Sequence, residues 1–348
     1  MAKKKATATA KFKGKAFCFG GRWGKYDKAE PLALIEMAGG KVATKVSASV
    51  DYVVVNSSQS GTTSAAEKQA LKLNQAGEAS ITVINEQDLT LLATPDRDET
   101  LELLKSASGI RSINRLMREL SLTLDVSGCQ FDNARLNELS VGGWHGHSGL
   151  VINGCSFRKA SLVDTNLSQG NGVCFDGADL SNASVNHMEN CSFKNAKLHG
   201  ANVYVSKQCC FDGADLTEAT INTADDCSFK KASGRKLTLQ PHSYHFRRGP
   251  AQVVNDFTGA DLTAACFANA SLGGSIFKSA KLCKADLRRC SLSKVDFTKA
   301  DLTGADLAGA DLSNAVLTGA NFADANLRGV TFDGANTDKA KNLVLPKQ

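Results

Sequence analysis

The sequence lacks an apolar run of about 18 residues, which is the length that a membrane-spanning helix needs. Its basic beginning, MAKKKATATAKFKGK, has no apolar core and therefore does not resemble a secretory signal. The composition does not indicate disorder, and 348 residues are enough for two domains. These absences predict a cytoplasmic protein that has no membrane partner.

The chain also lacks the groupings of side chains that catalysis requires. No serine has a matched His–Asp setting, no Gly-rich phosphate loop precedes a helix, and no paired carboxylates mark a cleft. The 11 cysteines contain no CxxC pair, the spacing that is typical of zinc sites. We therefore predict a protein that is not an enzyme, with no catalytic residue, no cofactor and no metal site.

A five-residue period runs without a break from Asn255 to Gly334. A small residue, usually Ala, precedes each central apolar residue by two positions, and Asp or Asn often lies between them. A period of five fits neither a helix nor a lone strand, so it indicates a solenoid of stacked coils. The central positions are Phe257, Leu262, Phe267, Leu272, Phe277, Leu282, Leu287, Leu292, Phe297, Leu302, Leu307, Leu312, Leu317, Phe322, Leu327 and Phe332.

This A(D/N)LXX pattern resembles the pentapeptide-repeat family, which implies a right-handed quadrilateral β-helix. Each of its four sides is expected to point one large and one small residue inward. The preceding segment repeats every 18 residues instead of 20, which predicts a contracted fourth side with a corner at Gly170 and Gly172. Together the two registers predict one stacked column of phenylalanine rings along the axis. Its members are Phe131, Phe157, Phe175, Phe193, Phe211, Phe229, Phe257, Phe277 and Phe297.

Five cysteines lie two residues before a phenylalanine of this column, at the small inward position. A metal site or a redox ladder is one interpretation of them. Packing is the other and is favoured, because Val173, Ser275 and Val295 occupy the same position in neighbouring coils and stacked thiols cannot close a zinc tetrahedron. The five are Cys129, Cys155, Cys191, Cys209 and Cys227.

Residues 12–93 alternate apolar runs with amphipathic segments, which predicts a small parallel α/β domain. The runs KGKAFCFGG, LIEMAGGKVATKVSASVDYVVV and INEQDLTLL resemble the BRCT family, most of all the type found in bacterial DNA ligases. The resemblance implies a phosphate or partner site at Gly20, Gly21 and Lys68. Phe19 stands where that family has Ser or Thr, and Leu89 stands where it often has Trp. A turn glycine and a solvated lysine are the alternative reading of Gly20 and Lys68.

The remaining segments complete the predicted organisation. Residues 1–11 form a basic tail, 94–122 a helical connector or cap interrupted near Gly109, 123–338 the β-helix and 339–348 a C-terminal tail. Residues 1–120 hold 18 Lys or Arg against 13 Asp or Glu, whereas residues 121–348 hold 23 against 22. The excess positive charge at the N-terminus is the kind that binds nucleic-acid phosphates, although a basic tail is more often only solvated.

Two interruptions of the coil spacing predict surface loops, where binding groups concentrate. They contain VGGWHGHSG and QPHSYHFRRGP. Aromatic and cationic side chains of this kind are enriched in hot spots of protein interfaces. The candidate contacts are Trp144, His145, His147, Tyr244, Phe246, Arg247 and Arg248.

The predicted function is a non-enzymatic binding or scaffold protein. Its BRCT-like domain engages a protein or DNA partner, the DNA through the basic N-terminal region, and its β-helix acts as a rigid docking surface. The family resemblance offers an alternative, a DNA mimic that modulates DNA gyrase or another topoisomerase. Mimicry requires an acidic face, and this repeat domain is almost neutral, with a basic belt at 278–294 and acidic residues at 296–338. A homodimer through 336–348 is also predicted, since an uncapped last coil exposes an edge.

Overall fold

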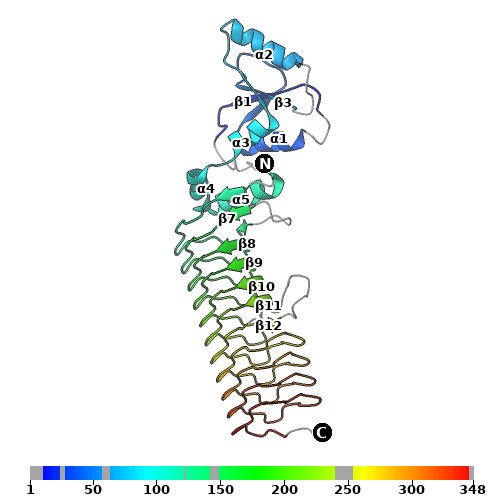
Figure 1. Cartoon of the computed structure of the whole chain (residues 1–348). Coiled ribbons are helices and arrows are strands. Elements are labelled where there is room, and N and C mark those ends of the chain that lie inside the picture. Colours follow the sequence, from blue (N-terminus) through cyan, green and yellow to red (C-terminus); the bar gives the residue numbers. More distant parts are fainter. Residues whose placement is uncertain are drawn as a thin grey trace, which may run out of the picture. The chain divides into compact units, whose positions relative to one another are not determined.

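The computed structural model describes residues 11–23, 28–56, 63–120, 123–141, 149–239 and 254–344. The chain divides into two compact units (Figure 1). The first comprises residues 1–124 with 143–149, and the second comprises residues 125–142 with 150–348. Each unit is described below by itself.

The first unit contains the predicted small α/β domain. Four parallel strands, β1 (Ala16–Gly20), β2 (Lys41–Ala43), β3 (Tyr52–Val55) and β4 (Thr82–Asn85), pair in the order β2-β1-β3-β4. Strand β2 was not predicted, because its three residues are exposed or half-buried and show no apolar run. The α/β class expected from the alternation of elements is confirmed.

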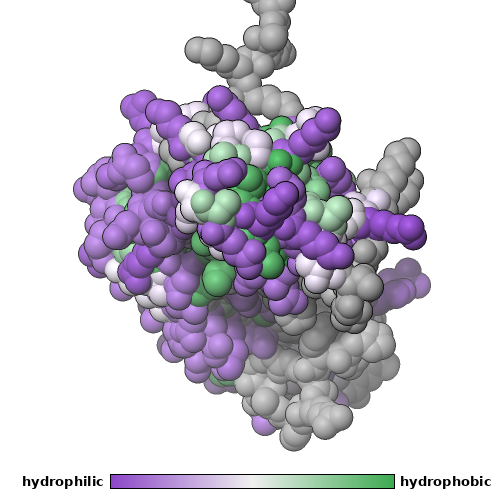
Figure 2. Space-filling model, turned by 90° about the horizontal axis from the view of Figure 1, so that it is seen from above, coloured by the Kyte–Doolittle hydropathy of each residue, from purple (hydrophilic) through white to green (hydrophobic). Residues whose placement is uncertain are grey.

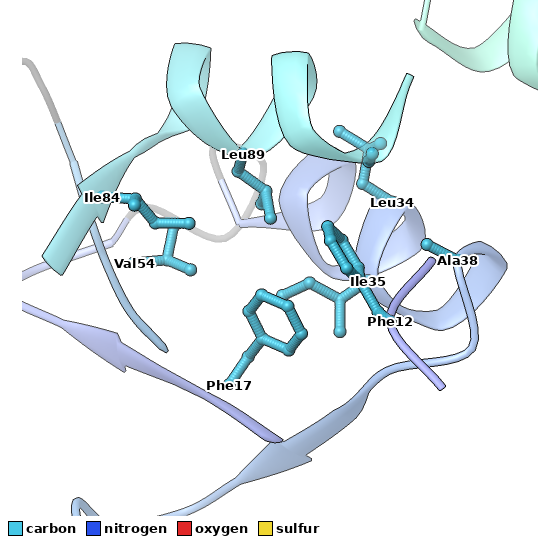
Figure 3. Close-up of a cluster of buried hydrophobic side chains, with 9 residues drawn as sticks. Phe12, Phe17, Leu34, Ile35, Ala38, Val54, Ile84 and Leu89 are labelled. Carbon is cyan, nitrogen blue, oxygen red and sulfur yellow. The ribbon is translucent and has the colours of Figure 1, made fainter. Parts of the chain in front are cut away.

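Helices cover both faces of this sheet. On one face, α1 (Ala29–Met37) and α3 (Glu86–Ala93) pack Ile35 and Leu89 against Phe17, Val54 and Ile84 (Figure 3). On the other, α2 (Ala65–Gln75) packs its buried Ala70 against the opposite side chains of β1 and β3, which are Cys18 and Val53. Adjacent strand residues thus bury alternate sides, as a sheet covered on both faces requires.

Two further helices belong to the first unit, α4 (Arg97–Leu104) and α5 (Ala107–Leu120). The predicted break near Gly109 was misplaced: it falls at residues 105–106, and Gly109 lies inside α5. A Cβ atom at Gly109 would come within 1.9 Å of the Leu103 carbonyl oxygen, so glycine is required by close packing against the end of α4. The Lys11 ammonium binds both the Thr94 carbonyl, at 2.7 Å, and Glu99, at 3.1 Å.

The second unit is a stack of coils (Figure 1). In the five-residue segment, each coil has four two-residue turns, and isolated parallel bridges join residues 20 positions apart, such as Asp261 to Lys281. The central Leu or Phe and the Ala two positions earlier are buried along this segment up to Phe322. The quadrilateral β-helix expected from the five-residue period is confirmed.

The 18-residue coils replace their last two sides by one six-residue strand and one turn. The strands are β8 (Asn166–Asn171), β9 (Ser184–Glu189), β10 (Asn202–Lys207) and β11 (Thr220–Asp225). With β6 (Ser140–Val141) and β12 (Thr238–Leu239) they form a parallel sheet in the order β12-β11-β10-β9-β8-β6. Two short strands, β5 (Thr123–Asp125) and β7 (Gly149–Val151), lie near the start of the segment.

The predicted corner at Gly170 and Gly172 is correct for one residue only. Gly172 has φ +66° in the turn that follows β8, a conformation that glycine adopts without strain. Gly170 lies inside β8 and points inward, where a Cβ would come within 2.8 Å of a Val173 methyl group. Its role is to leave space for the core, so the prediction of a corner there was wrong.

The phenylalanine column is confirmed. Neighbouring ring centroids from Phe131 to Phe277 are 4.7–5.3 Å apart and nearly parallel, and Phe297 follows at 5.1 Å with a 36° tilt. Full burial of one such side chain contributes about 1.5–3 kcal/mol. Because a slip of one residue would expose every ring, the column fixes the register of the whole stack.

The change from short to long coils is bridged by a buried asparagine. Asn255 is 2% exposed and occupies the inward column of the cysteines. Its side-chain oxygen accepts from the Cys227 backbone N–H at 2.9 Å, and its amide donates to the Ala224 carbonyl at 3.0 Å. Its own N–H donates to the buried Ser275 hydroxyl at 3.2 Å. Asn255 thus satisfies polar backbone groups of the last short coil.

Candidate partner-binding surfaces

The first candidate surface is the end of β1, where Gly20 meets the beginning of α2. A Cβ at Gly20 would lie 2.9 Å from the Ser64 hydroxyl, so only glycine permits this approach. Gly21 follows with φ +82°, and Lys68 is exposed in the first turns of α2. The structure therefore brings Gly20 and the α2 N-terminus together. Leu89, at the position where the resemblance has Trp, is fully buried in the core.

The N-terminus of α2 already has its own capping groups. The Glu67 N–H donates to the Ser64 hydroxyl, and the Glu67 carboxylate accepts from the Ser64 N–H at 2.7 Å. A carboxylate placed here interacts favourably with the helix dipole, as a bound anion would. An incoming phosphate would have to compete with Glu67, so the geometry suits a partner contact better than an anion site.

Aromatic groups flank the same edge. The Phe19 and Trp23 rings meet edge to face at 5.1 Å, and the Trp23 indole N–H donates to the Gly20 carbonyl. The Lys28 ammonium lies 4.4 Å from the centre of the Phe19 ring, within cation–π range. Phe19 therefore replaces a hydroxyl by an apolar, partly exposed surface. Figure 2 shows hydrophobic residues between hydrophilic ones on the surface that it views. Leu71 and Leu91 are two exposed hydrophobic residues of the first unit.

The predicted loop contacts cannot be placed. Trp144, His145, His147, Tyr244, Phe246, Arg247 and Arg248 all lie in 142–148 and 240–253, outside the described residues. They stay predictions from the sequence.

The β-helix carries its charges in a pattern that the sequence analysis missed. The segments VCFDGADL at 173–180 and CCFDGADL at 209–216 are 36 residues apart, as are CSFKNA at 191–196 and CSFKKA at 227–232. The repeating unit here is therefore a pair of coils. Residues 173–190 and 209–226 contain no Lys or Arg, whereas 191–208 and 227–239 contain no Asp or Glu. Comparing the sequence with itself at a 36-residue offset would have revealed this.

Ion pairs join the acidic coils to the basic ones. Lys207 pairs with Glu189 and Lys236 pairs with Glu218, each at 2.8 Å, and Lys197 lies 3.8 Å from Asp179. The alternation favours the correct stacking order, because like charges never meet in adjacent coils. It also gives this segment narrow bands of opposite sign rather than one uniformly charged face.

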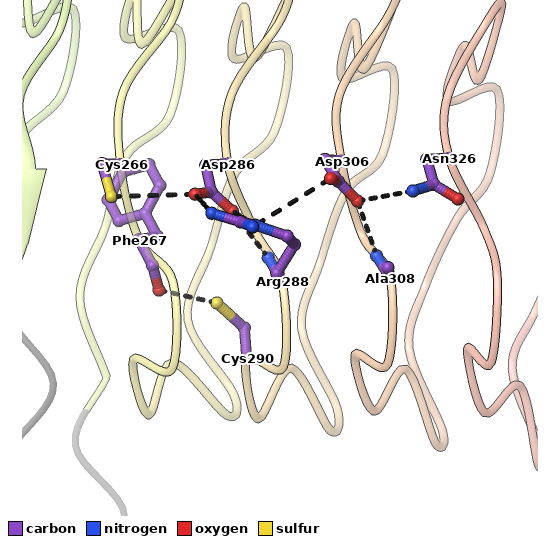
Figure 4. Close-up of polar contacts among 8 residues, drawn as sticks. All are labelled: Cys266, Phe267, Asp286, Arg288, Cys290, Asp306, Ala308 and Asn326. Carbon is purple, nitrogen blue, oxygen red and sulfur yellow. Dashed lines mark hydrogen bonds and ion pairs between the residues drawn. The ribbon is translucent and has the colours of Figure 1, made fainter.

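The basic belt of 278–294 surrounds one coil of the β-helix. Its six cations are distributed over all four sides of one coil, and one of them, Arg288, forms ion pairs with Asp286 and with Asp306 (Figure 4). The Arg288 guanidinium donates to Asp286 at 2.6 Å and lowers the pKa of that carboxyl below its ordinary value. Asp306 in the next coil accepts from the Ala308 N–H and from Asn326. The belt is therefore partly neutralised and presents no concentrated basic patch.

Most aspartates of the long coils serve the turns, as expected from their position in the repeat. Asp256, Asp296 and Asp311 each accept from the backbone N–H two residues later at 2.9 Å. The pKa of Asp301 is lowered, first of all by the hydrogen bond from Thr303. These carboxylates are structural groups as well as surface charges.

The described part of the chain holds no cluster of three or more His, Cys, Asp or Glu arranged for a metal ion. Among the same residues, no helix is both long and apolar enough to cross a membrane. Four of the five column cysteines are buried, and Cys129 is half-buried.

Comparison with known proteins matches one segment in each unit to a family profile. Residues 8–92 match the profile of the BRCA1 C-terminal (BRCT) domain, and residues 256–334 match eight copies of the pentapeptide repeat. Over 81 residues the chain is 37% identical to a DNA ligase of Prochlorococcus marinus, and over 90 residues it is 37% identical to a DNA ligase of Synechococcus sp.. These alignments cover 23% and 26% of this chain. The chain spans only 10% and 12% of the length of those ligases.

Solved structures with a similar fold include HetL, a pentapeptide repeat protein involved in heterocyst differentiation regulation in Nostoc. It is 22% identical, with a TM-score of 0.34, over 63% of this chain and 88% of HetL. QnrB1, a plasmid-mediated fluoroquinolone resistance protein, is 19% identical, with a TM-score of 0.26, over 61% of this chain and 91% of QnrB1.

Proposed function

We propose that this chain, which joins an N-terminal BRCT domain to pentapeptide repeats, is a non-enzymatic scaffold of the cytoplasm. Its BRCT domain engages a protein or DNA partner, and its β-helix presents a rigid docking surface. The observation that carries this proposal is the filled interior of the β-helix. Columns of large residues, mostly Phe and Leu, and of small residues, mostly Ala, fill the interior, so the outward side chains are held in fixed rows about 4.8 Å apart.

We place the partner contact of the BRCT domain at the edge formed by Gly20, Gly21 and Lys68. Phe19 and Trp23 supply aromatic area there, and Lys28 and Lys68 supply positive charge. Aromatic groups bordered by cations are typical of interface hot spots. The Glu67 carboxylate at the α2 N-terminus favours a partner contact over a phosphate contact at this edge.

Binding to duplex DNA, measured across a series of salt concentrations, tests whether the partner of the N-terminal region is DNA. We expect the full chain to bind with a steep salt dependence, because its basic tail would release counterions from phosphates. The variant Lys3→Gln/Lys4→Gln/Lys5→Gln should flatten the slope of log K against log salt by about 0.9 per lost contact. The control Lys278→Gln/Lys281→Gln/Lys284→Gln removes the same charge from the belt and should leave the slope unchanged.

Absence of DNA binding, or an equal change of the salt slope in both variants, would contradict DNA binding through the basic tail. The partner of the N-terminal domain would then be a protein. A pull-down with the full chain as bait then identifies that partner. The second candidate function, DNA mimicry toward a gyrase or another topoisomerase, is favoured only by the aspartates of 296–338. Inhibition of gyrase supercoiling by the full chain would support it, although the alternating bands and the belt argue against a continuous acidic face.

We also propose a homodimer through the last coil. Leu327 and Phe332 are half-buried there and Val344 is 77% exposed, in contrast to the fully buried interior of earlier coils. An unpaired coil edge favours pairing with another chain. Light scattering should give twice the chain mass, and Leu327→Asp/Phe332→Asp should reduce it to one. A monomeric wild-type chain would refute the dimer.

A further inference from the structure

Three consecutive coils carry a buried thiol at the same inward position. Cys191, Cys209 and Cys227 are each 2% exposed and lie 18 residues apart in the column beside the phenylalanine rings. The rings of the same three coils are 4.7 and 5.0 Å apart, which sets the spacing of the layers. No other part of this column holds three cysteines in succession.

The thiols of these coils are stacked at one inward position of adjacent layers. Each thiol donates to nearby backbone carbonyls. Cys191 donates to Gly170 and Glu189 at 3.4 and 3.2 Å, and Cys209 donates to Met188 and Lys207 at 3.5 and 3.4 Å. The Met188 thioether sulfur lies 4.0 Å from the Cys191 sulfur and adds a second kind of soft sulfur to this layer. Thiolate and thioether sulfurs are the ligands that soft cations such as Cu(I) select.

One polar group beside these thiols has no partner. Ser206 is fully buried in β10, and its hydroxyl has no hydrogen-bond partner among the described residues. Ser206 precedes Cys209 by three residues, as Met188 precedes Cys191, and its carbonyl accepts from the Cys227 thiol. A buried hydroxyl without a partner costs free energy unless something else uses it. A thiolate formed in this layer is a hydrogen-bond acceptor that this hydroxyl lacks.

We propose that two adjacent thiols of this column, Cys209 with either Cys191 or Cys227, bind one soft, thiophilic monovalent cation of the Cu(I) or Ag(I) type. The ion is bound linearly by two thiolates of adjacent coils, with Cys209 as the shared ligand. With metal–sulfur bonds as long as those of zinc thiolates, about 2.3 Å, two sulfurs on opposite sides of the ion lie about 4.6 Å apart. The layers of the stack have nearly this spacing, so the fold needs no rearrangement to hold the ion.

The binding step involves no oxidation or reduction. Two S–H bonds break, two metal–sulfur bonds form, and two protons pass to the solvent. The product carries one net negative charge, which the Ser206 hydroxyl stabilises by donating a hydrogen bond. A zinc ion is excluded by the same geometry, because a column of stacked side chains supplies ligands along one line and not at the corners of a tetrahedron.

Silver(I) serves as the probe, since it is stable in air and shares this coordination chemistry. The half-exposed thiols of the full chain, Cys129, Cys174, Cys210, Cys266 and Cys283, are first blocked with iodoacetamide under native conditions. Burial protects the column thiols from this reagent, which attacks thiolates. The blocked protein is then titrated with silver(I). Native mass spectrometry reports the stoichiometry, and a pH-stat reports the protons released.

We expect one ion per chain, with two protons released. Cys209→Val should abolish this binding, and valine fits the position because Val173 and Val295 occupy it in other coils. Ser206→Ala should weaken the affinity about 10-fold or more, as loss of a group that supports a metal ligand does. The control Cys290→Ala removes a lone buried thiol from another column and should bind as the wild type does.

Two results would overturn the site. One is a blocked wild-type chain that takes up no silver ion. The other is a Cys209→Val variant that binds as many ions as the wild type, which would locate the ion elsewhere. Because Cys209→Val preserves packing, unchanged circular dichroism of the variant separates loss of the ligand from loss of the fold.

Discussion

Replacement of Phe211 by alanine is expected to lower the free energy of unfolding of the β-helix by about 3–5 kcal/mol, the usual cost of deleting a buried ring. Phe211 is fully buried and stacks between Phe193 at 4.7 Å and Phe229 at 5.0 Å. The cavity would lie in the middle of the stack, where rigid coils on both sides prevent collapse. Urea unfolding of the full chain, followed by circular dichroism, measures the change.

The control for this variant is Phe332→Ala. Phe332 belongs to the same repeat pattern but is only half-buried in the last described coil, so its removal leaves no closed cavity. We expect it to cost less than half as much as Phe211→Ala. Equal losses for the two variants would mean that the repeat pattern, and not burial within the stack, determines the contribution of each ring.

Replacement of Asn255 by alanine is expected to cost about 2–6 kcal/mol, because two buried backbone groups would each lose a partner at about 1–3 kcal/mol. These groups are the Cys227 N–H and the Ala224 carbonyl. The loss should be concentrated where the short coils give way to the long ones. Amide hydrogen exchange in the full chain should therefore show faster exchange around residues 224–227 than in distant coils.

Asn326→Ala supplies the matched comparison for this prediction. Asn326 is exposed and donates to Asp306 on the outer surface at 2.9 Å, where water can replace the lost bond. We expect a change within about 0.5 kcal/mol, as for most surface substitutions. If Asn255→Ala is equally mild, a water molecule or a shift of the chain satisfies the two backbone groups.

The candidate partner edge at Gly20, Gly21 and Lys68 was only partly predictable from the sequence. The resemblance pointed to Gly20, Gly21 and Lys68, and the structure brings Gly20 next to the N-terminus of α2. The sequence analysis did not reveal that Glu67 caps this helix and occupies the place an anion would take. The spacing S-x-x-E from Ser64 to Glu67 is the sequence signature of a capping box, so the sequence alone was enough to predict this cap.

The inward-facing residues of the β-helix could be predicted from the sequence alone. A strict five-residue or 18-residue period leaves one register in which every large apolar residue points inward, so the phenylalanine column follows from the spacing alone. The alternation of acidic and basic coils was equally present in the sequence, at an offset of 36 residues.

The assembled coils and helices, and not the local sequence, show which positions are constrained by close packing or by a buried backbone group. Gly170 leaves space for Val173 inside a strand, Gly109 admits the end of α4, and Asn255 supplies bonds to a coil that begins about 30 residues earlier. A local pattern shows which side of a coil a residue faces, but it does not show which backbone group lies opposite. These roles depend on close packing and on the satisfaction of buried polar groups, which only the assembled coils define.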